Sequence, residues 1–125
     1  MPLDGTTYES PIRSLCKMDQ VIDLLSDEMR WCKARLETPD GRHCIAGAII
    51  AVGAGVELRK PIQLAIKQVT GHRRSRIEVF NDDPLTTHAL VMKVLLQARD
   101  NVAAAAPSTM EHEVTLLGRL RRVFG

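Results

Sequence analysis

The clearest hydrophobic pattern in the chain lies in its first third, where apolar residues recur alternately three and four positions apart. The series is Leu15, Met18, Ile22, Leu25, Met29, Cys32 and Leu36. This spacing keeps the apolar side chains on one face of a helix, so it predicts a helix that Ser14 caps and that ends before residues 38–41, Thr-Pro-Asp-Gly. Residues 1–13 hold two prolines and show no helical period, which predicts an extended N-terminal arm.

Residues 44–56, CIAGAIIAVGAGV, carry no charge and have no polar face. A helix that is apolar all round is buried, so this stretch predicts the central helix of the fold. One of its faces consists of the small residues Cys44, Gly47, Ala48, Ala51 and Gly55. Because small side chains allow close approach, we expect another helix or Trp31 to lie against that face.

The middle of the chain predicts one further helix and one ambiguous segment. Pro61 suits the first position of a helix, and Gly71 suits the position just past its end. Residues 76–80 form either a helical turn or a short strand. Ser75 with Glu78 makes a capping pattern that favours the turn, whereas RIEVF also alternates as a strand does.

Two amphipathic stretches complete the pattern. Residues 88–105 predict a helix, and Pro107 separates it from a last one that Ser108 and Glu111 are spaced to cap. The apolar stripe of that last helix is Met110, Val114, Leu117, Leu120 and Phe124. The sequence thus predicts an all-α domain over residues 14–125, a compact bundle of about five helices around a buried central helix at 44–56.

Composition agrees with this fold. Hydrophobic residues make up 45% of the 125 residues, which is normal for a folded domain of this length. The aromatic residues are only Tyr8, Trp31, Phe80 and Phe124, so the core must be aliphatic, as suits helices packed on helices.

Charge and cysteine usage restrict the surroundings of the protein. The N-terminus lacks the pattern of a signal peptide, and the longest uncharged run, residues 44–56, is too short to span a bilayer. The three cysteines are an odd number without secretory context, which predicts reduced thiols in a cytoplasmic protein. The formal charge is +2, which is not the strong excess of an obligate nucleic-acid binder.

Nucleic-acid contact is nevertheless the second hypothesis. Basic residues cluster at 72–76 and 119–122, where they could meet phosphates. The helix predicted after residue 61 is also similar to the recognition helix of a DNA-binding protein. The candidate contacts are Gln63, Lys67, Arg73, Arg74, Arg76, Arg119, Arg121 and Arg122. Against it, the preceding helix has no polar face to lie along DNA, and the few aromatic residues leave little for base stacking.

The polar run at residues 80–87, FNDDPLTT, raises a choice between chemistry and chain geometry. Asn81 tolerates the backbone shape that ends a helical turn, Asp83 and Pro84 suit the first two positions of a type I turn, and Thr87 suits an N-cap. The alternative is an oxygen-rich metal site, but the run lacks the spaced acids and final Glu of a calcium loop. We therefore interpret the run as structural.

The chain also resembles an uncharacterised family of small bacterial and phage proteins. They share a C-x-x-G-A element and a later W-N-D-x-x-x-x-T-x-x-x-V element. The matching residues here are Cys44, Gly47 and Ala48, then Phe80, Asn81, Asp82, Thr87 and Val91. Phe80 replaces the usual Trp, and Leu90 stands where a capping Glu is common. The resemblance, over about residues 17–103, implies a helical domain and supplies no catalytic residues.

Cys44 is the one candidate nucleophile, because a helix N-terminus and neighbouring His43 can lower the pKa of a thiol. The competing interpretation is a small buried residue, which we favour because no third orienting group is identifiable. The four histidines and three cysteines lack zinc-ligand spacing, so no metal or cofactor is expected.

The sequence alone does not state a biological role. The expectation is a non-enzymatic protein that acts through protein–protein contact, as a homodimer. Self-association through the first helix or the last helix would cover an excess of apolar surface. In the alternative, the apolar series of the first predicted helix packs inside the monomer. An enzyme that uses Cys44 as its nucleophile is the third hypothesis.

Overall fold

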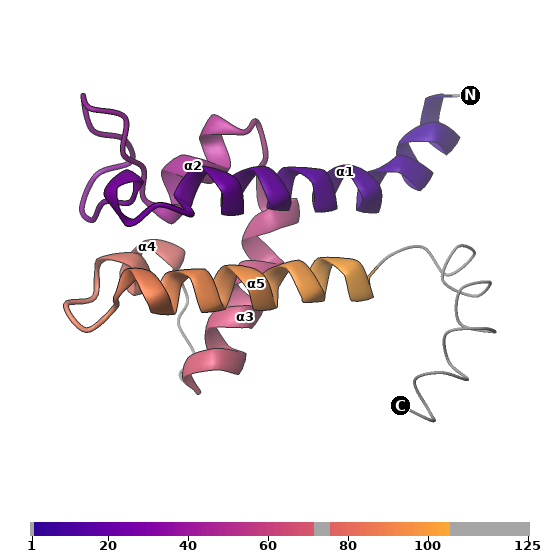
Figure 1. Ribbon diagram of the computed structural model, residues 1–125. Helices are drawn as coiled ribbons and strands as arrows, with labels where there is room; N and C mark the ends of the chain where they lie inside the picture. Colours follow the sequence, from indigo (N-terminus) through magenta and orange to yellow (C-terminus); the bar gives the residue numbers. More distant parts are fainter. Residues whose placement is uncertain (1, 72–75, 106–125) are drawn as a thin grey trace.

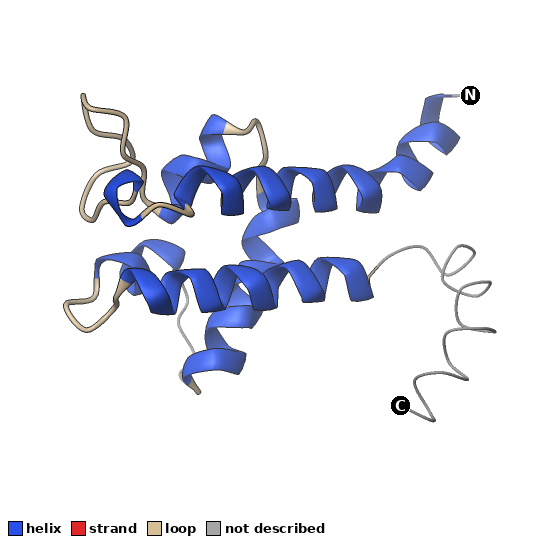
Figure 2. Ribbon diagram, in the orientation of Figure 1, coloured by secondary structure: helices blue, strands red, loops and turns tan. Residues whose placement is uncertain are grey.

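The structure of the protein, a computed structural model, describes residues 2–71 and 76–105, with side chains from residue 12 onward. These residues form α1 (Pro2–Leu25), the short 3-10 helix η1 (Glu28–Arg30), α2 (Ile45–Ala51), α3 (Val56–Thr70), α4 (Ile77–Asp82) and α5 (His88–Ala104). Across the described residues there is no strand, only two isolated β-bridges within the loop before α2. The all-α prediction is confirmed (Figure 2).

Two long helices and one crossing helix make the frame of the fold. α1 and α5 lie side by side and run in opposite directions, while α3 crosses both (Figure 1). The short helices α2 and α4 lie toward one end, together with the loops before α2 and between α4 and α5 (Figure 1). Among the described helices, none is long and apolar enough to cross a membrane.

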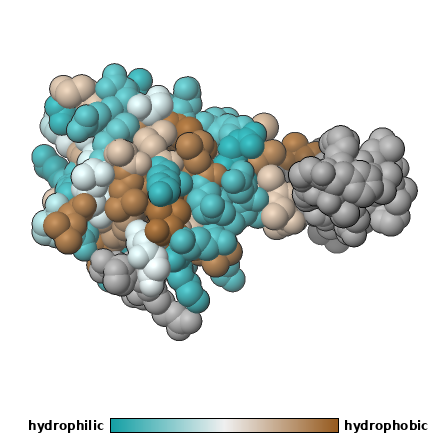
Figure 3. Space-filling view, turned by 60° about the horizontal axis from the view of Figure 1, so that its bottom comes forward, coloured by the Kyte–Doolittle hydropathy of each residue, from teal (hydrophilic) through white to brown (hydrophobic). Residues whose placement is uncertain are grey.

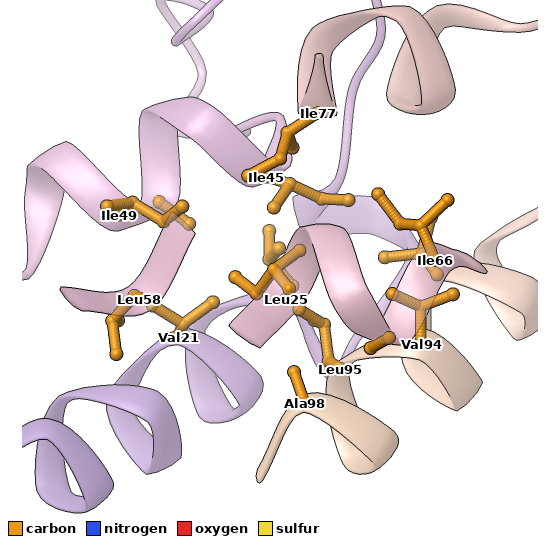
Figure 4. Close-up of a cluster of buried hydrophobic side chains, with 14 of the residues drawn as sticks. Val21, Leu25, Ile45, Ile49, Leu58, Ile66, Ile77, Val94, Leu95 and Ala98 are labelled. Carbon is orange, nitrogen blue, oxygen red and sulfur yellow. The ribbon is translucent and has the colours of Figure 1, made fainter. Parts of the chain in front are cut away.

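The core is aliphatic and draws on all five α-helices. Figure 4 shows side chains from each helix converging on a common centre. The fully buried ones include Val21 and Leu25 of α1, Ile45 of α2, Leu58 and Ile66 of α3, Ile77 of α4, and Val94 and Leu95 of α5. Each such side chain contributes about 1.5–3 kcal/mol when it leaves water, so this cluster is the main source of stability.

The N-terminal arm predicted for residues 1–13 is wrong over the described part, because α1 begins at Pro2. Proline fits the first turn of a helix at no cost, since its missing N–H would have no partner there. A proline further inside a helix bends it, and Figure 1 shows α1 bent in its N-terminal part. Neither Pro2 nor Pro11 therefore ends the helix.

The first helix was also predicted to continue to residue 36, but α1 ends at Leu25. The Ser26 hydroxyl donates to the Asp23 carbonyl (2.9 Å), and the Asp27 carboxylate accepts from the Met29 N–H (2.9 Å). Ser and Asp side chains compete for backbone groups in this way and end helices. The apolar seam therefore stops at Leu25, and its buried members face the core of the same chain.

The central helix is shorter than predicted, and its neighbour is longer. α2 covers only Ile45–Ala51, and Gly53, with φ of +76°, follows it in the left-handed region. Ile45 to Ile49 are buried as expected, whereas Ile50 is exposed. α3 begins at Val56, so Pro61 lies inside it and not at its first position.

The remaining boundaries settle one open choice. Residues 77–82 form a helix, not a strand, and the N-cap position is Arg76 without a side-chain capping bond. Ser75 lies outside the described residues, and Glu78 pairs with Arg59 of α3 through two 3.0 Å contacts. α5 matches its prediction, whereas the last predicted helix lies outside the described residues.

Candidate functional site

Asn81 is the centre of a polar network at one end of the molecule. Its side chain is fully buried, and its Oδ1 accepts hydrogen bonds from Trp31 Nε1 (2.8 Å) and the Ile45 N–H (3.1 Å). Its Nδ2 donates to the Cys32 carbonyl (3.1 Å) and to Asp82 Oδ1 (2.9 Å). Both lone pairs and both amide hydrogens are used, which makes this buried amide fully satisfied.

The Asn81 amide replaces one rung of a short parallel ladder. The His43 N–H donates to the Arg30 carbonyl (2.8 Å), and the Cys32 N–H donates to the His43 carbonyl (3.0 Å). The next rung of such a ladder would join the Ile45 N–H directly to the Cys32 carbonyl. Asn81 takes both ends, so α4 joins the two ends of the 31–44 loop through one side chain.

The other polar residues of the 80–87 run have backbone partners as well. Asp82 Oδ1 accepts from the Ala34 N–H (2.8 Å), where Ala34 has a left-handed φ of 68°. The Asp83 carbonyl accepts from the Thr86 N–H (2.9 Å), and Thr86 Oγ1 donates to the Phe80 carbonyl (2.7 Å). Thr87 caps α5 by accepting from the Leu90 N–H (3.2 Å).

These contacts support the structural interpretation of the run, with one correction. Asn81 lies inside α4 and has no left-handed backbone, so it is a buried bridge and not the residue that ends the helix. In the described part of the chain, no three His, Cys, Asp or Glu side chains are grouped so that they could hold a metal ion.

The C-x-x-G-A element shapes the start of α2. Cys44 is its N-cap, and the Cys44 sulfur accepts from the Gly47 N–H (3.3 Å). A Cβ atom added to Gly47 would stand 1.8 Å from the Leu36 carbonyl oxygen, so only glycine fits. The close approach predicted for this face exists, but its partner is the backbone at Leu36 and not Trp31. Ala48 is buried in the core.

Trp31 and Lys33 join the two loops. Lys33 Nζ donates to the Asp83 carbonyl (2.7 Å) and lies 5.5 Å from the centre of the Trp31 ring. Trp31 also contacts the ring of His88, with 6.0 Å between centroids. His88 Nε2 in turn lies 2.7 Å from the Leu25 carbonyl. Residues 26–44 and 83–87, which we call the loop end, are thus bound to one another and to α1 (Figure 2).

The thiols of this region are not activated. Burial raises the pKa of Cys44, against the lowering effect of hydrogen bonds from Gly47 and Ala46. Burial, with the nearby Cys44, also raises the pKa of Cys32. Among the described residues, the His43 ring contacts Glu37, with 3.9 Å between His43 Nε2 and Glu37 Oε2. At neutral pH the thiol, and not the nucleophilic thiolate, is therefore favoured at both positions.

The surface of the loop end is apolar at three points. Leu85 is 86% exposed, Met29 64% and Leu36 51%. Figure 3 views the α3–α5 side and shows apolar surface at the left, where the loops lie, as well as across the middle of this face. Periodicity did not single out these residues as a surface, because Met29 and Leu36 fit the helical seam.

Only three of the predicted nucleic-acid contacts fall in the described part. Gln63 is half-buried and Lys67 exposed on α3, and Arg76 is exposed before α4. The remaining predicted contacts, Arg73, Arg74, Arg119, Arg121 and Arg122, lie outside the described residues. Nucleic-acid contact therefore stays a prediction.

The fold and this site define a small all-α protein in which a buried asparagine and a glycine hold two loops at one end of a helical frame. Residues 17–101 match a family of unknown function, DUF6197, and because they are most of the chain, the protein belongs to that family. No curated protein and no solved structure matches the chain.

Proposed function

We propose that this protein is a non-enzymatic interaction protein whose loop end binds another protein surface, with a second copy of the chain as the partner. The observation that carries the proposal is the exposure of Leu85, Met29 and Leu36 on loops that buried hydrogen bonds hold in place. Exposed apolar surface is typical of contact sites.

The way these loops are held supports a binding role. A loop that orders only on binding loses conformational entropy at that moment, which weakens the complex. Here the Asn81 amide, the Asp82 carboxylate and Lys33 already fix the loop backbone. The exposed leucines are therefore presented in a preorganised arrangement, as in other proteins that carry binding loops on a rigid scaffold.

A non-enzymatic role is supported by the state of the two thiols. A cysteine nucleophile needs a lowered pKa or a base in contact with it. Cys44 has a raised pKa, and its sulfur is used to cap α2. Pairing with a second copy is supported by symmetry, because a two-fold contact covers the same apolar surface on both chains at once.

Sedimentation equilibrium of the full chain tests the proposal. We expect a mass that rises above the 13.9 kDa of one chain as the concentration increases through the micromolar range. Leu85→Asp should return the mass to that of one chain, because a carboxylate would be buried at the contact. Val56→Asp is the matched control: Val56 is 62% exposed but lies at the start of α3, where an acid is tolerated.

Two results would contradict parts of the proposal. A mass of one chain at every concentration would remove the self-association. A dimer that Val56→Asp disrupts and Leu85→Asp does not would place the contact outside the loop end.

A further inference from the structure

A hollow of about 370 Å³ lies between α1, α3 and the last turn of α5, which Figure 1 shows on the side of the molecule opposite the loops. Its apolar lining consists of Pro61 and Leu64 of α3 and of Val102 and Ala105 at the end of α5. Pockets that hold small molecules have volumes of this order, and a few polar groups on a mostly apolar lining set their specificity. The polar groups of this hollow therefore indicate which kind of molecule fits it.

Ser14 of α1 lines the hollow with a hydroxyl that the fold does not use. The residue is only 9% exposed, and among the described residues its hydroxyl has no hydrogen-bond partner. A serine inside a helix can satisfy its hydroxyl by donating to a carbonyl of the preceding turn, but Ser14 does not. Because a buried hydroxyl without a partner costs free energy, a bound molecule that accepts its hydrogen bond would be stabilised.

Two charged residues of α3, Glu57 and Lys60, also line the hollow, and only the acid is compensated. The Glu57 carboxylate accepts from the Gly55 N–H (3.1 Å) at the start of α3, where a negative charge is favoured. Lys60 forms no ion pair or side-chain hydrogen bond within the described part of the chain. The hollow thus offers one uncompensated positive charge and one hydroxyl donor.

The α3–α5 wall of the hollow is already in place. Asn101 Nδ2 donates to the Pro61 carbonyl (3.2 Å) and to Gln68 Oε1 (2.8 Å), which joins the end of α5 to the middle of α3. A ligand that enters a preformed hollow does not have to order these two helices, so less of its binding free energy is lost.

We propose that this hollow binds a small monocarboxylic acid with an apolar body. The hydrocarbon would lie on Pro61, Leu64 and Val102, and the carboxylate would accept from the Ser14 hydroxyl and pair with the Lys60 ammonium. One lysine balances one negative charge, which favours a monocarboxylate over a dianion such as a phosphate monoester. The site is separate from the loop end, and the inference does not depend on the proposed function.

Titration of octanoate into the 15N-labelled full chain, followed by amide chemical shifts, tests the site. We expect saturable shifts at residues of the hollow, such as Leu64 and Ala105, and none at Leu85 of the loop end. Octylammonium keeps the apolar body but reverses the charge, and butyrate keeps the head but shortens the body. Each should bind at least about tenfold more weakly than octanoate, since each loses one of the two contributions.

Two variants test the polar contacts. Lys60→Gln should weaken octanoate binding by about tenfold, because an ionic hydrogen bond is lost. Lys67→Gln is the matched control: Lys67 is also exposed on α3 but does not line the hollow, so the affinity should not change. Ser14→Ala should weaken binding several-fold. Alanine favours the helix more than serine does, so this variant should still fold in the absence of ligand.

Four results would overturn the proposal. The first is the absence of saturable shifts at the hollow. The second is equal affinity for octanoate and octylammonium, which would mean that only the apolar body is recognised. The third is an equal loss in Lys60→Gln and Lys67→Gln, which would indicate general attraction to surface charge. The last is a set of shifts centred on the loop end, which would place the acid there.

Discussion

The helical frame and the loop end are stabilised in different ways. In the frame, α1, α3 and α5 bury aliphatic side chains that touch many neighbours, and the contribution of each is spread over the cluster. Where the loop end meets α2 and α4, a few groups each hold a specific backbone position. The Asn81 amide joins three separate segments, and Gly47 lets the Leu36 carbonyl approach α2.

The difference affects how the two regions respond to change. An aliphatic core tolerates exchanges of similar volume, because neighbouring side chains adjust. A buried amide that satisfies several backbone groups has no substitute of similar shape, and its removal leaves all of them without partners. We therefore expect the loop end and its contacts with α2 and α4 to be more sensitive than the core to conservative substitutions, and the first predictions below test that sensitivity.

Gly47→Ala should have the largest effect. Its Cβ would stand 1.8 Å from the Leu36 carbonyl oxygen, a distance that requires the loop backbone or α2 to move. We expect a loss of about 3 kcal/mol in the free energy of unfolding, at the upper end for overpacking. Chemical denaturation monitored by circular dichroism would measure it.

Gly55→Ala is the matched control for this substitution. A Cβ there would stand 3.5 Å from a Glu57 carboxylate oxygen, which is ordinary contact. The free energy of unfolding should change by less than about 1 kcal/mol. Equal effects at both glycines would show that the Leu36 carbonyl does not constrain α2.

Asn81→Ala should have the next largest effect, about 2 kcal/mol, because the part-buried Trp31 Nε1 and the buried Ile45 N–H lose their acceptor. Adding Trp31→Phe removes one of those stranded donors. The double variant should then lose less stability than the sum of the two single variants. Strict additivity would mean that the indole–amide hydrogen bond contributes nothing to the fold.

The frame could be predicted from the sequence, because its helices follow a period. The apolar spacing of α1 up to Leu25, the burial of residues 45–49 and the Thr87 cap of α5 all follow from local pattern. The same reasoning failed at residues 26–36. There the apolar spacing continues by coincidence, and the Ser26 and Asp27 side chains end the helix.

The loop end could be predicted only in part. The 80–87 run was interpreted as structural, which its backbone hydrogen bonds support, and the C-x-x-G-A and N-D elements were identified as motifs. The partners of Asn81 could not be predicted, since Trp31 and Ile45 are 50 and 36 residues away and no sequence period connects them. Only the folded chain brings the two motifs together around one amide.

The Arg59–Glu78 pair joins α3 to α4 and should give a smaller, pH-dependent effect. Burial would raise the pKa of Glu78, but its backbone hydrogen bond and Arg59 outweigh it, and the pKa is lowered from 4.5. Because the pKa of Glu78 is lower in the folded state, the pair stabilises the fold fully above pH 4.5. This stabilisation is lost as the pH falls through the folded-state pKa. In both Glu78→Gln and Arg59→Gln, the free energy of unfolding should fall less steeply as the pH is lowered below 4.5. An unchanged slope in both variants would contradict this.

Cys44 should react slowly with a thiol reagent, because the fold already keeps its thiol protonated and covered. Cys44 is 4% exposed and burial raises its pKa, whereas Cys16 lies exposed on α1. Alkylation of native protein at neutral pH, followed by mass spectrometry, should modify Cys16 first. Cys44 should react on the order of a hundredfold more slowly, since reaction there requires local opening of the loop end. Gly47→Ala should increase the alkylation rate of Cys44 and leave that of Cys16 unchanged, because it disturbs the loop end and not the part of α1 that carries Cys16. Fast labelling of Cys44 in the unmodified chain would show an accessible thiolate and favour the enzyme hypothesis over the interaction protein.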